Sequence, residues 1–204
     1  KNGFCFYNLS DNDNPVFRSI PDKNRRIIKA AFSPDEKYFA VAFYDHTVSL
    51  YEIGSWKSGE LLLIDTLEGH TATINSIAFS NPYGRYLITL DNNYIMIVWE
   101  HTANGFERVD RCRLQAEEEI TAIEFNPYNA GVFAYASMKG FVVIYNITDC
   151  RIENTLRSGG GRVYDLAFSS SGYLAAGDEK NAWLWDIEMQ GHNPDGMWFA
   201  HSTD

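Results

Sequence analysis

Cysteine is scarce in this chain of 204 residues, and its three residues, Cys5, Cys112 and Cys150, form no CxxC pair. Their odd number and wide spacing favour free thiols over a disulfide framework or a metal site. Long hydrophobic runs are also missing, because no apolar run approaches the roughly 18 residues that a membrane span needs. We therefore expect no membrane span and no metal centre, and an intracellular location, either cytoplasmic or nuclear.

Positive charge is short as well. Seventeen Lys and Arg stand against 27 Asp and Glu, which leaves a formal net charge of −10. Proteins that bind the phosphate backbone normally carry a basic patch. Direct binding of nucleic acid as the main activity is therefore disfavoured, and the expected partners are other proteins or peptides.

Motifs for catalysis are absent from the sequence. It has no GxSxG, Walker-type or HExxH motif, and none of its five histidines lies at metal-ligand spacing from another. The glycine-rich stretch 158–162 could cradle an anion, but it precedes an expected strand rather than a helix, so a loop is the better interpretation. We expect no cofactor and no catalytic residues.

Short apolar runs dominate what is present. In the stretch 69–100, runs of four to eight residues rich in β-branched and aromatic side chains are separated by turn-forming residues such as Asn81, Pro82 and Gly84. At 45% hydrophobic and 15% aromatic residues, the chain can bury a sizeable core. These features predict an all-β protein.

The stretch 69–100 is one copy of a repeat. A Phe followed by Ser or Asn recurs at intervals of 47, 46 and 43 residues, and an aromatic residue closes each copy 17 to 20 residues later. The Phe residues are Phe32, Phe79, Phe125 and Phe168, and the closing residues are Tyr51, Trp99, Tyr145 and Trp185. Four copies of a two-part pattern at near-constant spacing indicate four repeated structural units.

One copy begins with Gly69-His70, and another ends with Trp185-Asp186. At this repeat spacing, these motifs resemble those of the WD-repeat β-propeller family. The resemblance covers essentially the whole chain and implies four-stranded antiparallel blades. We expect one domain, 1–204, with blades at about 27–67, 73–114, 120–156 and 163–190, and with 1–20 and 193–204 as parts of other blades. Family members usually have seven blades, so the resemblance implies part of a longer ring, or a partner that completes it.

The family often joins a His, a Ser or Thr, an Asp and the Trp in a buried hydrogen-bonded network. His70 and Trp99 match in the second copy, where Asn93 takes the acidic position unless Asp91 reaches in. Asp45 matches in the first copy, but Tyr51 replaces the Trp there. We therefore expect an incomplete network in every copy. The structural residues implied by the resemblance are Phe32, Asp45, Tyr51, His70, Phe79, Trp99, Phe125, Tyr145, Phe168, Trp185 and Asp186.

The resemblance also implies one face, around the central channel, on which partners bind. It would carry the residues at the start of each innermost strand and those at the turns between second and third strands. The strand-start residues are Arg26, Thr73, Glu119 and Arg162, and the turn residues are Tyr44, Asn92, Met138 and Asp178. Tyr, Met and Arg are enriched at protein interfaces.

Three functions are consistent with this pattern. The first is a non-enzymatic scaffold that holds proteins within a multi-subunit complex. The alternative is a reader of peptides or modified residues. This function predicts an acidic, aromatic-lined pocket near Tyr44, Glu119 and Asp178. A pocket dominated by Arg26 and Arg162 would count against it. The third is a propeller enzyme, whose remaining candidates are Asp45 and His46.

Overall fold

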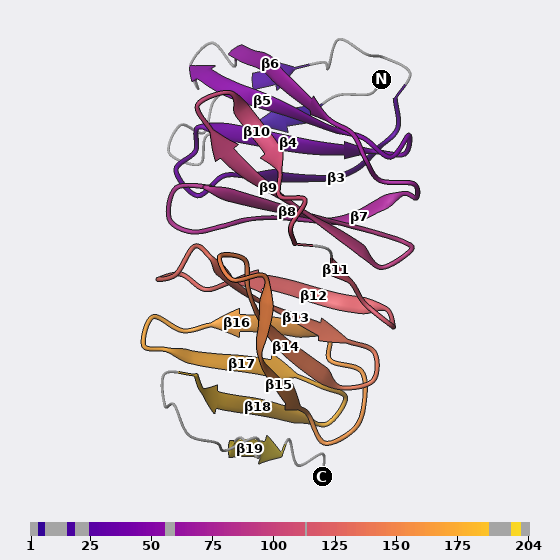
Figure 1. Ribbon diagram of the computed structural model, residues 1–204, viewed down its shortest axis with the longest axis vertical. Helices are drawn as coiled ribbons and strands as arrows, with labels where there is room; N and C mark the ends of the chain where they lie inside the picture. The colour runs from indigo at the N-terminus through magenta and orange to yellow at the C-terminus, as the bar shows by residue number, and fades with distance from the viewer. Residues whose placement is uncertain are drawn as a thin grey trace.

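Four antiparallel sheets follow one another along the long axis of the molecule (Figure 1). The structure is a computed structural model that describes the backbone of residues 4–6, 16–18, 25–55, 60–112, 114–187 and 197–200, and the side chains of 25–54, 61–112 and 114–187. Every described strand pairing is antiparallel and joins neighbours in the chain, apart from a short extra strand in the second sheet. This arrangement is the all-β propeller architecture that the repeats predict.

Blade 1 contains β3 (Ile27–Phe32), β4 (Tyr38–Phe43), β5 (Val48–Ser55) and β6 (Glu60–Leu67), in that order. The turn between β3 and β4 is closed by polar side chains, because Ser33 donates its hydroxyl to Asp35 at 2.7 Å and accepts from the Tyr38 amide at 2.9 Å. Side chains at turns commonly satisfy main-chain groups in this way. The turn thus returns β4 alongside the innermost strand.

Blade 2 contains β7 (Ile74–Phe79), β8 (Tyr86–Asp91), β9 (Ile95–Thr102) and β10 (Gly105–Arg108), and β11 (Leu114–Gln115) also pairs with β9. Gly84 in the turn between β7 and β8 has a φ of +64°, and a Cβ there would come within 3.0 Å of the Cβ of Ser33 in blade 1. Glycine is therefore required both by the backbone conformation and by the approach of the neighbouring blade.

Blade 3 contains β12 (Ile120–Phe125), β13 (Val132–Ser137), β14 (Phe141–Asn146) and β15 (Arg151–Arg157). Blades 1, 2 and 3 share a register irregularity at the start of the innermost strand, between Ile27 and Lys29, Ile74 and Ser76, and Ile120 and Ala122. A bulge at equivalent positions explains why the apolar residues before each Phe depart from strict alternation.

Blade 4 contains β16 (Asp165–Phe168), β17 (Tyr173–Gly177), β18 (Asn181–Asp186) and β19 (Met197–Ala200). The sequence assigned residues 193–204 to a further blade, but β19 pairs with β18 and forms the outer strand of blade 4. The partner of a single strand depends on which sheet edge is open after folding, and spacing along the chain does not specify it. Of residues 1–20, β1 (Phe4–Phe6) and β2 (Val16–Arg18) form a separate two-stranded sheet.

Among the described residues, three of the four hydrophobic clusters lie between blades, and the fourth lies on the side of blade 1 away from blade 2. One cluster joins β4 and β5 of blade 1 to blade 2, a second joins blade 2 to blade 3, and a third joins blade 3 to blade 4. All six residues of β8 are buried, which places side chains from both of its faces in these clusters. Blades 2 and 3 are therefore covered on both sides by their neighbours, as expected for stacked sheets.

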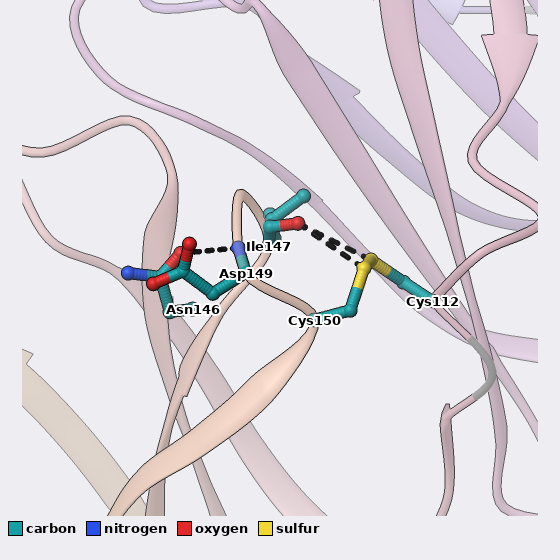
Figure 2. Close-up of a disulfide and its surroundings, with 5 residues drawn as sticks. All are labelled: Cys112, Asn146, Ile147, Asp149 and Cys150. Carbon is teal, nitrogen blue, oxygen red and sulfur yellow. Dashed lines mark hydrogen bonds between the residues drawn. A yellow bond between two sulfur atoms is a disulfide. The ribbon is translucent and has the colours of Figure 1, made fainter.

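A disulfide ties blade 2 to blade 3. Cys112 follows β10 and Cys150 ends the turn between β14 and β15, and their Cα atoms lie 5.1 Å apart across 38 residues of sequence. Figure 2 shows that both sulfur atoms face the main-chain oxygen of Ile147, at 3.2 and 3.3 Å. The expectation of free thiols is wrong for these two residues, because the packing of adjacent blades brings together cysteines that are distant in sequence.

The disulfide yields a prediction about stability. Reduction of Cys112–Cys150 frees a loop spanning 38 residues in the unfolded chain, so the free energy of unfolding should fall, by about 2–4 kcal/mol in the chain-entropy model. Thermal or urea unfolding with and without a reducing agent measures the difference. The double variant C112S/C150S is the control, because reductant should not change its stability. Equal stability of the oxidised and reduced wild type would contradict the prediction.

Candidate partner-binding face

A buried polar network holds the turns of blade 2. His70 precedes β7, and its Nδ1 lies 2.8 Å from a carboxylate oxygen of Asp91 at the end of β8. Its Nε2 lies 2.7 Å from the hydroxyl of Thr89, which also accepts the indole N–H of Trp99 at 2.9 Å. Thr89 and Asp91 are fully buried. Buried polar groups must find partners, and this set satisfies its members internally.

The network defines the proton positions of His70. The carboxylate of Asp91 can only accept, so Nδ1 of His70 carries a proton and donates to it. Nε2 of the neutral ring then accepts, and its donor is the hydroxyl of Thr89, which also accepts from the Trp99 indole. Burial lowers the pKa of His70 despite the opposing effect of Asp91. The imidazole is therefore neutral in the folded protein at pH 7.

Blade 2 thus contains the complete network, and the expectation that every copy lacks it is wrong. Asp91, not Asn93, supplies the carboxylate, and it also accepts the main-chain N–H groups of Asn93 and Ile95. In blade 2, Thr89 lies two residues after the residue that pairs with the closing aromatic residue. The equivalent positions of blades 1, 3 and 4 hold Val41, Tyr135 and Ala176, so these blades have no Ser or Thr there.

Blades 1 and 4 use their carboxylates differently. Asp45 accepts two hydrogen bonds from Arg25, at 2.7 and 3.1 Å, and one from the Thr47 hydroxyl at 2.8 Å. Asp178 accepts from the Lys180 and Asn181 amides. It also accepts from the indole of Trp183, at 2.6 Å. Trp183 therefore takes the role expected of Trp185, whose indole nitrogen is buried without a hydrogen-bond partner.

These contacts shift the pKa of both carboxyl groups. Burial raises the pKa of Asp45. The hydrogen bonds from Arg25 and Thr47, together with the charge of Arg25, lower this pKa by more than burial raises it, so the net shift is downward. Burial likewise raises the pKa of Asp178, and the hydrogen bonds from Lys180, Trp183 and Asn181 outweigh it. Both residues are ionised at neutral pH and committed to contacts within their own blades.

The eight residues expected to bind partners define a surface that we call the turn face: Arg26, Tyr44, Thr73, Asn92, Glu119, Met138, Arg162 and Asp178. In blades 1, 2 and 3 a main-chain hydrogen bond joins each turn residue to its strand-start residue. These bonds run from Tyr44 to Arg26, from Asn92 to Thr73 and from Met138 to Glu119, at 2.8, 3.0 and 3.0 Å. The structure therefore brings together three of the four predicted pairs.

Blade 4 departs from this pattern. The amide of Tyr164, rather than that of Asp178, makes the corresponding bond, and its acceptor is the carbonyl of Gly177 at 2.8 Å. Arg162 instead reaches toward blade 3, where its guanidinium lies 3.8 Å from the carboxylate of Glu119. Glu119 and Arg162 thereby connect the strand starts of two adjacent blades, while Asp178 points into its own turn.

Arginine and aromatic side chains alternate on the turn face. The guanidinium of Arg26 lies 5.5 Å from the ring centre of Tyr44, and that of Arg162 lies 5.4 Å from the ring centre of Tyr164. These are cation–π distances. Tyr44 is 57% and Met138 is 40% exposed, so apolar area is available between the charges.

Sequence reasoning missed several residues that shape this region. Tyr164 follows the predicted Arg162 closely and is largely exposed. Arg25 precedes the predicted Arg26, and it lies over the ring of Phe43 at 3.7 Å while binding Asp45. Tyr164 and Arg25 belong to the same short segments as the predicted Arg162 and Arg26, so the sequence offered a reason to include them in the predicted face. Thr89 had a signal too, since the family network includes a Ser or Thr.

The repeat anchors lie mostly in the core. Buried positions are held by Tyr51, Phe79, Trp99, Phe125, Tyr145 and Trp185, whereas Phe168 is half-buried. Phe32 is 44% exposed and packs against Phe39 with ring centres 4.6 Å apart. Asp45 and Asp186 are exposed at turn and strand-end positions.

No three His, Cys, Asp or Glu side chains among the described residues converge as metal ligands. Asp45 and His46, the candidates for a propeller enzyme, share a turn in which Asp45 is occupied by Arg25 and Thr47. Within the same described residues, no helix has the length and apolar character needed to cross a bilayer.

Comparison with known proteins supports the fold. Residues 18–52 and 62–100 match the model of the family described as "WD domain, G-beta repeat". A chain in a crystal structure of a mitotic checkpoint complex superposes with a TM-score of 0.72 at 14% identity, covering 93% of this chain and 58% of that one. At this identity the similarity concerns the fold.

Curated relatives are similar over parts of their length. Nuclear distribution protein PAC1 of Arthroderma otae is 24% identical over 196 residues, which cover 92% of this chain and 41% of that protein. The B beta isoform of the 55 kDa regulatory subunit of serine/threonine-protein phosphatase 2A, from Carassius auratus, is 31% identical over 141 residues, covering 59% and 32%. The chain spans less than half the length of these relatives.

The network of blade 2 predicts the effect of a single substitution. Thr89→Val keeps the shape of the side chain but leaves the indole of Trp99 and Nε2 of His70 without partners. The free energy of unfolding should fall by about 1–3 kcal/mol. Urea unfolding measures it, with Thr155→Val on the exposed strand β15 as the matched control. A loss no larger than that of the control would show that the network contributes nothing.

The lowered pKa of His70 predicts a dependence of stability on pH. Below about pH 6.5 the unfolded chain binds a proton at His70 that the folded chain resists. Stability should therefore decline as pH falls, by up to about 1.4 kcal/mol for each pH unit. Unfolding of the wild type and of His70→Gln between pH 7 and pH 5 isolates this contribution. Parallel profiles for the two proteins would contradict the prediction.

Proposed function

We propose that this chain, a member of the WD-repeat β-propeller family, is a non-enzymatic scaffold whose turn face holds protein partners within a multi-subunit complex. Proteins of this family generally mediate interactions between proteins in complexes. The finer role assigned to this chain rests on its own surface, because an activity belongs to a site and not to a fold.

The observation that carries the proposal is the main-chain bonding of the turn face. Hydrogen bonds between strand starts and turns in three blades hold Tyr44 and Met138 in position before any partner arrives. A surface that is already ordered loses little conformational entropy on binding. Exposed Tyr and Met side chains next to arginines then provide apolar contact area with charged surroundings.

The names of similar proteins agree with such a role. One relative is a regulatory subunit of a phosphatase, and the similar solved chain belongs to a checkpoint complex. In both cases the name describes a component of an assembly. We propose the same general behaviour for this chain and leave the identity of its partners to experiment.

The alternative, a reader of peptides or modified residues, is not favoured. It requires open aromatic and acidic groups at Tyr44, Glu119 and Asp178. Arg26 instead lies over Tyr44, Arg162 pairs with Glu119, and the carboxylate of Asp178 binds donors of its own blade. The arginines therefore dominate the region in which a basic peptide would have to bind.

Three further features belong to the same proposal. The blades are part of a seven-bladed ring, completed within a longer chain or by a partner. The location is intracellular, cytoplasmic or nuclear, although the Cys112–Cys150 disulfide is a bond more common in oxidising compartments. Direct contact with nucleic acid is not part of the function, given the net charge of −10.

Substitution on the turn face tests the proposal. The double variant Y44A/M138A, expressed with a tag in the native cells, should lose at least one specific co-purifying protein by about tenfold or more, as expected when central interface side chains are removed. Quantitative mass spectrometry of the purified complexes measures the loss.

The matched control is Ile152→Ala on strand β15, which truncates a similarly exposed apolar side chain, 55% against 57% for Tyr44, on a different surface. Both variants must unfold at the wild-type temperature for the comparison to count. If the turn-face variant and the control retain the same set of partners in the same amounts, the turn face is not the docking surface.

A further inference from the structure

The outer strand of blade 1 has an edge with which no other described strand pairs. β6 is the last strand of its sheet and pairs with β5 on one side. It lies at the opposite end of the molecule from blade 4 (Figure 1). An outer strand presents main-chain N–H and C=O groups that another strand can bind, so proteins usually protect such edges with charge or brevity.

This edge lacks the protection found on the outer strands of blades 2 and 3. β10 has only four residues and ends in Glu107 and Arg108. β15 is exposed at Arg151 through Thr155 and includes charged residues along that run. In β6, by contrast, Leu62, Leu63 and Ile64 are 60, 52 and 37% exposed, without a charge between them. An apolar, unpaired edge of this kind marks an interaction site.

The two faces of β6 differ in chemistry. Leu61 faces Ile53 and Leu63 faces Tyr51, and Leu61 packs against the apolar cluster on the side of blade 1 away from blade 2. Leu62 faces Glu52 and Asp65 faces Leu50, on the side toward blade 2. Because side chains alternate along strands, an added strand would meet Leu61 and Leu63 on one face. On the other face it would meet Leu62, with Glu52 of β5 and Asp65 beside it.

We propose that the edge of β6 binds an extended segment of a partner protein by strand addition. The segment carries apolar residues at alternate positions, which contact Leu61 and Leu63, and Lys or Arg between them, near Glu52 and Asp65. Main-chain hydrogen bonds give such binding its affinity, and alternate side chains give it selectivity. The register shift at Ile64 limits the added ladder to the stretch 60–63.

Charge argues for a basic partner over a second copy of this chain. The formal net charge is −10, so two copies of the chain repel each other. A Lys- or Arg-bearing strand turns the carboxylates of Glu52 and Asp65 into favourable contacts.

The test uses the full chain and a capped, fluorescein-labelled heptapeptide of alternating valine and lysine, with fluorescence anisotropy as the measurement. Binding should weaken about tenfold or more when glutamate replaces lysine in the peptide, a change of about 1.4 kcal/mol. Glu52→Lys in the protein should reverse that preference. The reversal separates the proposed site from general attraction between a basic peptide and an acidic protein.

Two further variants distinguish strand addition from apolar adhesion. Leu63→Lys should abolish binding, whereas Ile152→Lys on β15, at similar exposure, should leave it unchanged. N-methylation of alternate amides in the peptide should abolish binding in one set of positions and preserve it in the other, since only one set faces β6.

Five results would overturn the proposal. Four of them are no binding at millimolar peptide, equal binding of the lysine and glutamate peptides, equal effects of the two N-methyl sets, and dimerisation of the full chain that Leu63→Lys abolishes. Slow hydrogen exchange of the outward amides of β6 in the isolated chain would also overturn it, by showing that the chain covers this edge itself.

Discussion

Burial of both faces of the second strands of blades 1, 2 and 3 is the constraint on which the rest of this structure depends. Residues 39–43 and the whole of β8 are buried, so side chains from opposite faces of the same strand enter different apolar clusters. Full burial of each such large apolar side chain contributes about 1.5–3 kcal/mol. A single blade would expose both of these faces to water, and its stability therefore comes from its neighbours, as in other repeat proteins.

Polar contacts stabilise a few turns and strand ends of this apolar stack, and the largest buried set lies in blade 2. His70, Thr89, Asp91 and Trp99 satisfy one another inside the blade, and Cys112 bonds blade 2 to blade 3. The other blades close their turns with shorter sets, such as Asp45 with Arg25 or Asp178 with Trp183. The turns that carry exposed Tyr44 and Met138 are held by main-chain bonds, so the rigidity of the stack extends to the surface.

The proposed functions use two different surfaces created by the same architecture. The turn face presents side chains fixed at the ends of inner strands, whereas the edge of β6 presents the main chain itself. The first selects partners through Tyr, Met and Arg contacts, and the second through hydrogen bonding to an extended segment. Their separation on the molecule allows each to be substituted without touching the other.

The sequence by itself determined the repeat and the strands, because spacing, alternation and turn residues are local properties of the chain. Phe79 and Trp99 identify blade 2 without any coordinates. Only the tertiary structure decided that Asp91 rather than Asn93 meets His70, that Cys112 bonds Cys150, and that β19 closes blade 4. These contacts join groups that lie close together only after neighbouring segments have packed, and spacing along the chain does not specify that packing.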